Sequence, residues 1–204
     1  MGAATSQHGD MTDSDAAYEA SVAMVRAETG GVLERIVSAD PPGASLGDLA
    51  ALVAGADRVF VLGAGRSGLA LRMTAMRLMH LGLVVHVVGE VTTPALGAGD
   101  VLLTASGSGT TAGVVRAAEM AVEAGAEVGA FTTADDSPLA ALARAVVIVP
   151  AAQKLDRTGH SSAQYAGSLF EQLVVLLGDA LFDVLWRRSG KTADELWPRH
   201  ANIE

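Results

Sequence analysis

Hydrophobic and polar positions divide the chain into two parts with different periodicities. Up to residue 38, apolar residues recur at helical spacing, which predicts one long N-terminal helix beginning at Ser14 or Asp15. A short second helix is expected over residues 46–54, with Ser45 as its N-terminal cap. From residue 58 onward, short apolar runs alternate with helical stretches, so the pattern changes to one of strands and helices.

Each short apolar run predicts a buried β-strand, and the runs lie at residues 58–62, 83–88, 101–105, 127–131 and 145–149. Helices are expected at residues 67–81, 110–124, 137–143, 164–188 and 192–197. Strands and helices that alternate in this way form right-handed βαβ units. The sequence therefore predicts an α/β fold with a five-stranded, parallel, doubly wound sheet.

Composition narrows the class of protein further. The 204 residues suit one domain, and we expect a disordered tail over residues 1–13 followed by a single domain over residues 14–204. The net charge of −9 and the lack of a basic patch disfavour a nucleic-acid partner. No apolar run reaches the roughly 18 residues that span a bilayer, and no signal peptide is evident. Together with the absence of cysteine, these features predict a cytoplasmic protein without a membrane partner.

The first of two glycine-rich turns, Gly63-Ala64-Gly65-Arg66-Ser67-Gly68, fits the pattern G-x-G-x-x-G between a predicted strand and a predicted helix. A dinucleotide-binding turn has this context, and Glu90 could be its ribose ligand. The spacing from Gly63 to Glu90 exceeds the usual ~20 residues, so we disfavour a nicotinamide enzyme. Ser67 is instead expected in a ligand crevice beyond the strand ends, and Arg66 faces either substrate or a neighbouring acid.

The second glycine-rich turn follows the third predicted strand and opens a helix. It consists of Ser106, Gly107, Ser108, Gly109, Thr110 and Thr111. Four hydroxyls, two glycines and the N–H groups of a helix N-terminus are suited to holding a phosphate. The alternative is an ordinary helix cap, because serine and threonine are common at helix starts. A run of six small or hydroxyl residues favours the phosphate, so all six are candidate substrate-binding residues.

Several further stretches carry, together with these turns, a resemblance to a known family. They are residues 75–82 (AMRLMHLG), 88–90 (VGE), 92–94 (TTP), 168–171 (SLFE) and 199–204 (RHANIE). Together the stretches resemble the sugar isomerase (SIS) domain family, and more narrowly its 6-phospho-3-hexuloisomerases, over roughly residues 15–204. One departure lies at residues 164–167 (QYAG), where family members usually carry Pro-Leu-Gly or Pro-Met-Gly ahead of the acidic helix. The contacts of this loop are therefore expected to differ.

The resemblance implies a three-layer αβα sandwich with an N-terminal helix and a long C-terminal helix, assembled as a homo-oligomer, a tetramer. It also implies the conversion of D-arabino-3-hexulose 6-phosphate to D-fructose 6-phosphate through a cis-enediol, in the formaldehyde-fixing ribulose monophosphate pathway. No cofactor or metal is implied. Such chemistry needs a base, a phosphate anchor and donors for the enediolate oxygens.

Glu171 is the expected base, because a partly buried carboxylate in an apolar helix has its pKa raised towards neutral pH. The alternative is a carboxylate that stabilises the helix N-terminus. His80 and His200 are further catalytic candidates. His80 either contacts substrate or satisfies carbonyls at a helix end, and His200 either reaches a neighbouring subunit's site or lies on the surface. The histidines are scattered and lack an H-E-x-x-H pattern, so a metal site is not predicted.

The sequence leaves two other functions open. One is an SIS isomerase that acts on another sugar phosphate, and the other is a non-catalytic module that binds a sugar phosphate. Sensors of this superfamily usually carry a DNA-binding helix-turn-helix ahead of the SIS domain. Residues 1–57 are mostly acidic and alanine-rich and contain no basic recognition helix, which disfavours the sensor.

Overall fold

The computed structural model describes residues 7–38, 46–154, 156 and 158–203. Its strands are β1 (Arg58–Gly63), β2 (Val85–Val87), β3 (Asp100–Ala105), β4 (Glu127–Thr132) and β5 (Ala145–Ile148). Its helices are α1 (Gln7–Ser38), α2 (Leu46–Ala54), α3 (Arg66–Leu81), α4 (Ala112–Glu123), α5 (Pro138–Leu142), α6 (Ser168–Ser189) and α7 (Ala193–Leu196), with a 3-10 turn η1 (Trp197–Arg199). All five predicted strands are present, each within a few residues of its expected bounds.

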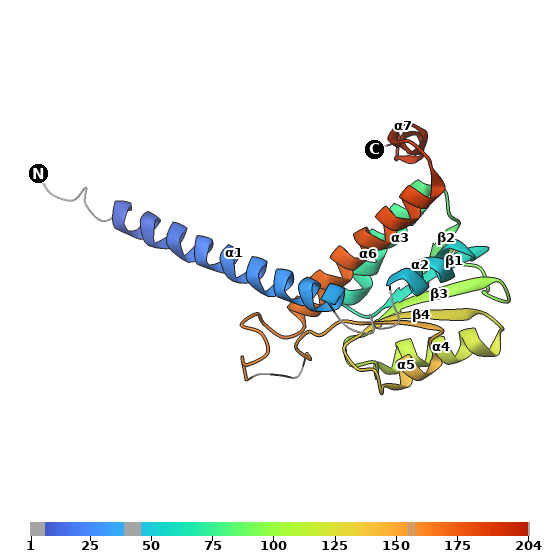
Figure 1. The fold of residues 1–204 in the computed structure, drawn as a ribbon, viewed down its shortest axis with the longest axis horizontal. Helices are drawn as coiled ribbons and strands as arrows, with labels where there is room; N and C mark the ends of the chain where they lie inside the picture. The colour runs from blue at the N-terminus through green and yellow to red at the C-terminus, as the bar shows by residue number, and fades with distance from the viewer. Residues whose placement is uncertain (1–6, 39–45, 155, 157, 204) are drawn as a thin grey trace, which may run out of the picture.

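The five strands form one parallel sheet in the order β2-β1-β3-β4-β5. Helices α2, α3 and α6 cover one face of this sheet, and α4 and α5 cover the other (Figure 1). The predicted three-layer, doubly wound α/β fold is therefore confirmed. The order reverses between β1 and β3, because the chain first builds β2 on one side of β1 and then crosses to the other side.

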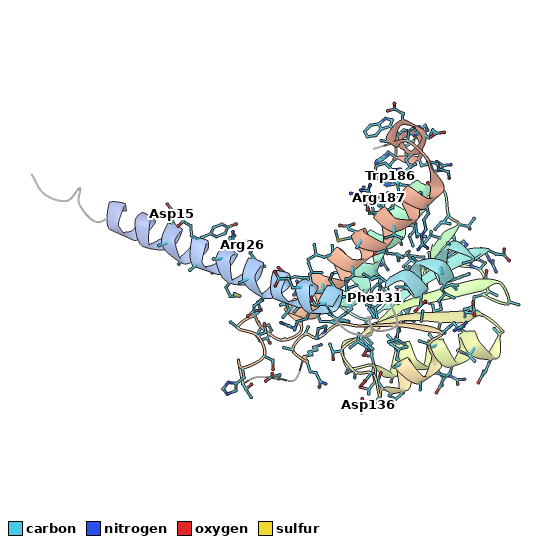
Figure 2. All side chains as sticks on the ribbon, viewed as in Figure 1. Asp15, Arg26, Phe131, Asp136, Trp186 and Arg187 are labelled. Carbon is cyan, nitrogen blue, oxygen red and sulfur yellow. The ribbon has the colours of Figure 1, made fainter. Side chains whose placement is uncertain are left out.

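The sheet separates two hydrophobic cores, and successive side chains of β1 point alternately into one core and the other. Val59 and Val61 point into the larger core under α3 and α6, whereas Phe60 points into the smaller core under α4 and α5. Every residue of β3 is buried, as expected for the central strand of a sheet with helices on both faces. Side chains crowd both faces in Figure 2, where Phe131 marks the sheet.

Helices α3 and α6 pack along each other on the larger core (Figure 1). Gly178 of α6 makes this packing close, because a Cβ at that position would overlap the Oγ1 atom of Thr74 on α3. The two helices therefore form one closely packed layer, and each of them begins at the edge of the sheet where the strands end.

Helix α1 joins the body only through its C-terminal part. Val32 is buried in the larger core, and Arg35 donates to the carbonyl of Pro150, while the N-terminal part projects away from the sheet (Figure 1). The helix begins at Gln7, before the expected start at Ser14 or Asp15. The tail over residues 1–13 stays a prediction, since residues 1–6 lie outside the described part of the chain. The same holds for Ser45 as a cap.

The start of α6 corrects one expected boundary. The sequence predicts a helix from residue 164, but α6 begins at Ser168. Ala166 has a φ of 51°, in the left-handed region that interrupts a right-handed helix, and Tyr165 is exposed on the turn before it. Apolar periodicity does not reveal a single residue with positive φ, so the boundary could not be placed from the pattern. Within the described residues, no helix combines the length and hydropathy that crossing a membrane requires.

Candidate active site

A pocket of about 210 Å³ lies where the strand order reverses, at the carboxyl ends of β1 and β3. Open α/β sheets bind ligands at this switch point. The pocket is lined by the turn after β1, the turn after β3, the loop after β5 and the first turn of α6. Its lining residues are Ala64, Gly65, Arg66, Ser67, Ala105, Ser106, Gly107, Ser108, Thr111, Ala152, Lys154, Gly167, Phe170 and Glu171.

Three helices begin at this pocket without a side-chain cap. The N-cap residues are Gly65 for α3, Thr111 for α4 and Gly167 for α6, and none of them accepts a hydrogen bond from its helix through a side chain. By contrast, the starts of α5 and α7 do not line the pocket, and they are capped by Ser137 and Thr192. The first N–H groups of an uncapped helix are free to bind an anion. The pocket therefore attracts negative charge through backbone dipoles as well as side chains.

The loop after β3 uses its hydroxyls to hold its own shape. The Oγ of Ser106 lies 2.9 Å from the Oγ1 of Thr111, so the threonine hydroxyl does not cap α4. Ser108 accepts a 2.9 Å hydrogen bond from the hydroxyl of Thr110. The ordinary-cap alternative thus fails at Thr111, and the N-terminus of α4 stays open to an anion.

Glycine is required within this loop for two different reasons. Gly109 has a φ of 63°, and a Cβ there would overlap the side chain of Ser137. Gly107 borders the pocket directly, with the ring of Phe170 3.4 Å from the place of its missing Cβ. Of the six predicted loop residues, Gly109 and Thr110 do not line the pocket. They shape the turn instead.

The first glycine-rich turn brings α3 close to β1. A Cβ on Gly63 would lie 2.8 Å from the backbone nitrogen of Gly68, and a Cβ on Gly68 would overlap the carbonyl of Gly63. This close approach is the helix–strand packing role of glycines in such turns. It places Ser67, which is buried, and Arg66, which is exposed, in the lining of the pocket.

Glu171 and Arg66 form an ion pair across the pocket. The Nη1 of Arg66 lies 2.9 Å from the Oε2 of Glu171 and donates a 3.0 Å hydrogen bond to the Oγ of Ser168. The Glu171 side chain is only 17% exposed. Of the two alternatives for Arg66, the structure therefore shows contact with a neighbouring acid. That acid is Glu171, the predicted base, in the first turn of α6.

Lys154, Ala152 and Phe170 also line the pocket and were not predicted from the sequence. Lys154 lies in the polar loop after β5, where a single lysine carries no motif. Its position beyond the carboxyl end of a fifth parallel strand is the signal that could have identified it.

His80 and His200 lie together, but not at this pocket. Their rings stack with centroids 4.0 Å apart, and Trp197 flanks His200 at 4.6 Å. His80 is in the last turn of α3, about 20 Å along the helix from Arg66 at 1.5 Å per residue. Burial lowers the pKa of His80, and His200 and Arg77 lower it further. Its buried Nδ1 has no hydrogen-bond partner among the described residues.

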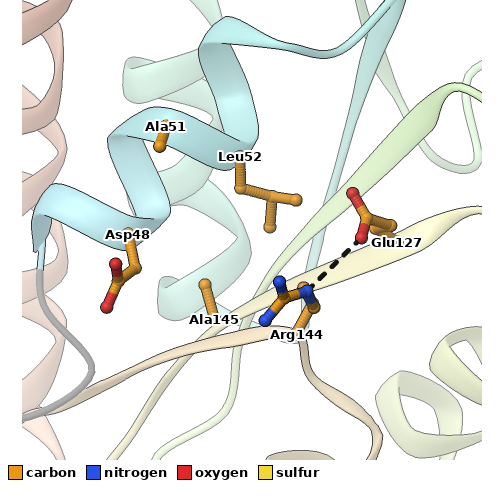
Figure 3. Close-up of a pocket in the computed structure, with 6 residues that line it drawn as sticks. All are labelled: Asp48, Ala51, Leu52, Glu127, Arg144 and Ala145. Carbon is orange, nitrogen blue, oxygen red and sulfur yellow. Dashed lines mark ion pairs between the residues drawn. The ribbon is translucent and has the colours of Figure 1, made fainter.

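A second hollow, of about 360 Å³, lies at the amino ends of β4 and β5 (Figure 3). Its charged residues are Asp48, Glu127 and Arg144, with 3.6 Å between the Nε of Arg144 and the Oε1 of Glu127. Two carboxylates against one guanidinium do not suit an anionic ligand, and the position is opposite to the ligand-binding edge of the sheet. In the described part of the chain, no cluster of three or more His, Cys, Asp or Glu residues could hold a metal ion.

Comparison with known proteins places these features in one family. Residues 52–176 match the sequence profile described as the SIS domain. The chain is 65% identical to a 3-hexulose-6-phosphate isomerase from Mycobacterium gastri, covering 72% of this chain and 74% of that protein. It is 37% identical to a protein of the same name from Bacillus subtilis (strain 168), covering 72% and 80%.

A solved structure shares the fold closely. A protein from Methanococcus jannaschii superposes with a TM-score of 0.78 at 26% identity, covering 90% of this chain and 99% of that one. The report of that crystal structure infers a molecular function of 3-hexulose-6-phosphate isomerase for it.

Proposed function

This chain belongs to the SIS domain family and, within it, to the 3-hexulose-6-phosphate isomerases, and on this premise we propose that its pocket converts D-arabino-3-hexulose 6-phosphate to D-fructose 6-phosphate. The observation that carries the proposal is the meeting of an open helix N-terminus and an ion-paired carboxylate in one pocket. The helix N-terminus binds the phosphate, and the carboxylate accepts the proton.

The phosphate is held by the loop of residues 106–111. Its oxygens accept hydrogen bonds from the first N–H groups of α4 and from the exposed hydroxyl of Ser108. The uncapped start of α4 supplies partial positive charge at the same point. Ser67 also lines the pocket and contacts the sugar hydroxyls.

Glu171 moves the proton between the two carbons. The carboxylate takes the proton from C2 of the 3-ketose, the C2–H bond becomes the C2–C3 double bond, and negative charge moves onto O3. The proton on O2 passes to O3, the carboxyl group of Glu171 returns its proton to C3, and the carbonyl forms at C2. Arg66 keeps the carboxylate in place through their 2.9 Å ion pair. Proton transfer within a cis-enediol needs a single base, because C2 and C3 present one face to it.

The oligomer and the two histidines complete the proposal. His80 and His200 lie about 20 Å along α3 from the pocket of their own chain, so they reach a site only across a subunit interface. We assign them to the site of a neighbouring subunit in a homotetramer, as donors to the sugar oxygens. The lack of cysteine supports a reducing, cytoplasmic location.

The test of the reaction is a coupled assay that supplies the 3-hexulose phosphate and detects fructose 6-phosphate. Turnover supports the proposal. Binding of sugar phosphates without turnover overturns it in favour of a non-catalytic module. Turnover of arabinose 5-phosphate or a heptose phosphate, but not of the hexulose phosphate, identifies a different SIS isomerase.

The base is tested by Glu171→Gln. This variant should lose about 10³-fold in kcat, the usual scale of general-base catalysis, because glutamine cannot accept the proton. Inhibition by inorganic phosphate should stay unchanged, since the phosphate binds at α4. Glu123→Gln, at the exposed end of α4, removes the same charge away from the pocket and serves as the control. Activity within tenfold of wild type would exclude Glu171 as the base.

A further inference from the structure

Lys154 is a positively charged residue that lines the pocket together with Arg66 and Glu171. The proposed proton transfer by Glu171 does not involve it. The substrate brings a phosphate, and its enediolate adds a further negative charge during the reaction. Arg66 is already engaged by Glu171 and Ser168. Among the described residues that line the pocket, Lys154 is the one cation without an ion pair or hydrogen bond.

The backbone of Gly167 places Lys154 beside the predicted base. A Cβ at Gly167 would lie 3.8 Å from the Cβ of Lys154 and 3.7 Å from the Oε1 of Glu171. Lys154, in the loop after β5, and Glu171, in the first turn of α6, therefore border the same glycine. Despite this closeness, the ammonium of Lys154 does not pair with the Glu171 carboxylate, whose Oε2 is bound to Arg66. The ammonium of Lys154 is therefore available to a ligand.

The position of Lys154 points to a role at the reacting carbons. Lys154 lies beside Gly167 and Glu171, and the phosphate loop lines the same pocket. Where Glu171 takes a proton from C2, negative charge develops on O3 and then on O2. The side chain of Lys154, whose Cβ lies beside Gly167, can extend its ammonium to those oxygens, and such donors act mainly in the transition state.

We propose that Lys154 is a catalytic residue whose ammonium donates hydrogen bonds to the enediolate oxygens of the sugar. This inference rests on the proposed isomerase function. The proton balance is unchanged by it: Glu171 carries the proton from C2 to C3, while Lys154 stays protonated and stabilises the charge on oxygen. The residue shares this task with the uncapped N-terminus of α6, which begins at Ser168 next to it.

The experiment compares wild type, Lys154→Met and Lys154→Arg in the coupled assay, with inorganic phosphate as a competitive inhibitor. Lys154→Met should lower kcat by about 100-fold, the usual loss for one oxyanion donor, and change KM and phosphate inhibition by less than about threefold. Lys154→Arg should regain part of the lost kcat because it keeps the charge. Arg144→Met, on the opposite edge of the sheet, is the matched control for a lost cation and should match wild type.

Each other outcome has a defined meaning. A Lys154→Met enzyme with kcat within threefold of wild type overturns the proposal. An unchanged kcat with raised KM and weakened phosphate inhibition also overturns it, because Lys154 would then bind the phosphate. If the methionine variant does not fold, judged by circular dichroism, Lys154→Gln is measured against the same two criteria. Absence of turnover in the wild type would instead reject the isomerase function, and the role of Lys154 with it.

Discussion

Asp100, at the start of β3, shows how one buried charge is stabilised in this fold. Its carboxylate accepts hydrogen bonds of 2.8 and 2.6 Å from the guanidinium of Arg58 and one of 2.7 Å from the N–H of Gly97. The hydrogen bonds from Arg58 lower the pKa of Asp100 below its ordinary value near 3.8, although burial opposes the shift. The pair ties β1 to β3 at the edge of the sheet opposite the pocket.

Asp100→Asn tests this contribution through its pH dependence. Because the folded state lowers the pKa, the carboxylate stabilises the protein above the unfolded pKa near 4, and this stability is lost as pH falls through the folded pKa. The variant should lose about 2 kcal/mol in the free energy of unfolding at pH 7, measured in urea. Its stability should then fall less steeply than that of wild type below pH 4. The exposed Asp194→Asn is the control, and identical pH slopes for the Asp100 variant and wild type would contradict the prediction.

At the scale of elements, α1 restrains the loop that leads into α6. The carboxylate of Glu28 accepts hydrogen bonds from the hydroxyl of Ser162, the N–H of Ala163 and the amide of Gln164, at 2.6, 2.7 and 3.0 Å. Burial raises the pKa of Glu28, but these hydrogen bonds outweigh it and the net pKa is lowered. A helix that contributes only its last turns to the core therefore supports the approach to the pocket.

Glu28→Gln should loosen this loop without unfolding the domain. A neutral amide replaces charge-assisted hydrogen bonds worth about 1.5 kcal/mol, so amide hydrogen exchange at Ala163 should accelerate about tenfold. Hydrogen–deuterium exchange with mass spectrometry measures this directly. Glu19→Gln, on the exposed part of the same helix, should leave the exchange unchanged. Equal protection in the Glu28 variant and wild type would show that the loop is held by other contacts.

At the scale of the whole molecule, the proposed catalytic groups of one chain lie at two distant places. Glu171 and Lys154 lie at the carboxyl edge of the sheet, and His80 stacks on His200 at the far end of α3. The C-terminal segment reaches that end because Arg199 packs over Gly82 and Lys191 donates to the carbonyl of Leu81. In a closed oligomer, the far end of one subunit can meet the pocket of the next.

Mixing two inactive variants tests this arrangement. If His200 serves the pocket of a neighbouring subunit, oligomers refolded from equal amounts of Glu171→Gln and His200→Ala chains should regain about a quarter of the wild-type sites, since each site draws its two groups from different subunits. The coupled assay measures the recovered rate. A mixture of Glu171→Gln and Glu171→Ala chains should regain nothing. Full activity of His200→Ala alone would remove this residue from the site.

Much of this structure was predictable from local pattern. The strands appear where short apolar runs occur, since period and burial are properties of consecutive residues. Ser67, Ser106 and Ser108 could be placed near one crevice because turns that follow parallel strands meet at one edge of the sheet, whereas Glu171 was assigned to the site by the family resemblance. The start of α6 was placed wrongly, because the positive φ of Ala166 depends on contacts that periodicity does not contain.

By itself, then, the sequence determined the class of fold, the edge of the sheet that binds ligand and the residue types gathered there. Only the tertiary structure decided which groups meet. It showed that Arg66 pairs with Glu171, that Thr111 leaves α4 uncapped, that Lys154 borders the same glycine as the base, and that His80 lies far from its own pocket. The physical reason is that hydrophobic period and turn chemistry act along the chain, whereas charge pairing depends on distances across the fold that spacing in sequence does not encode.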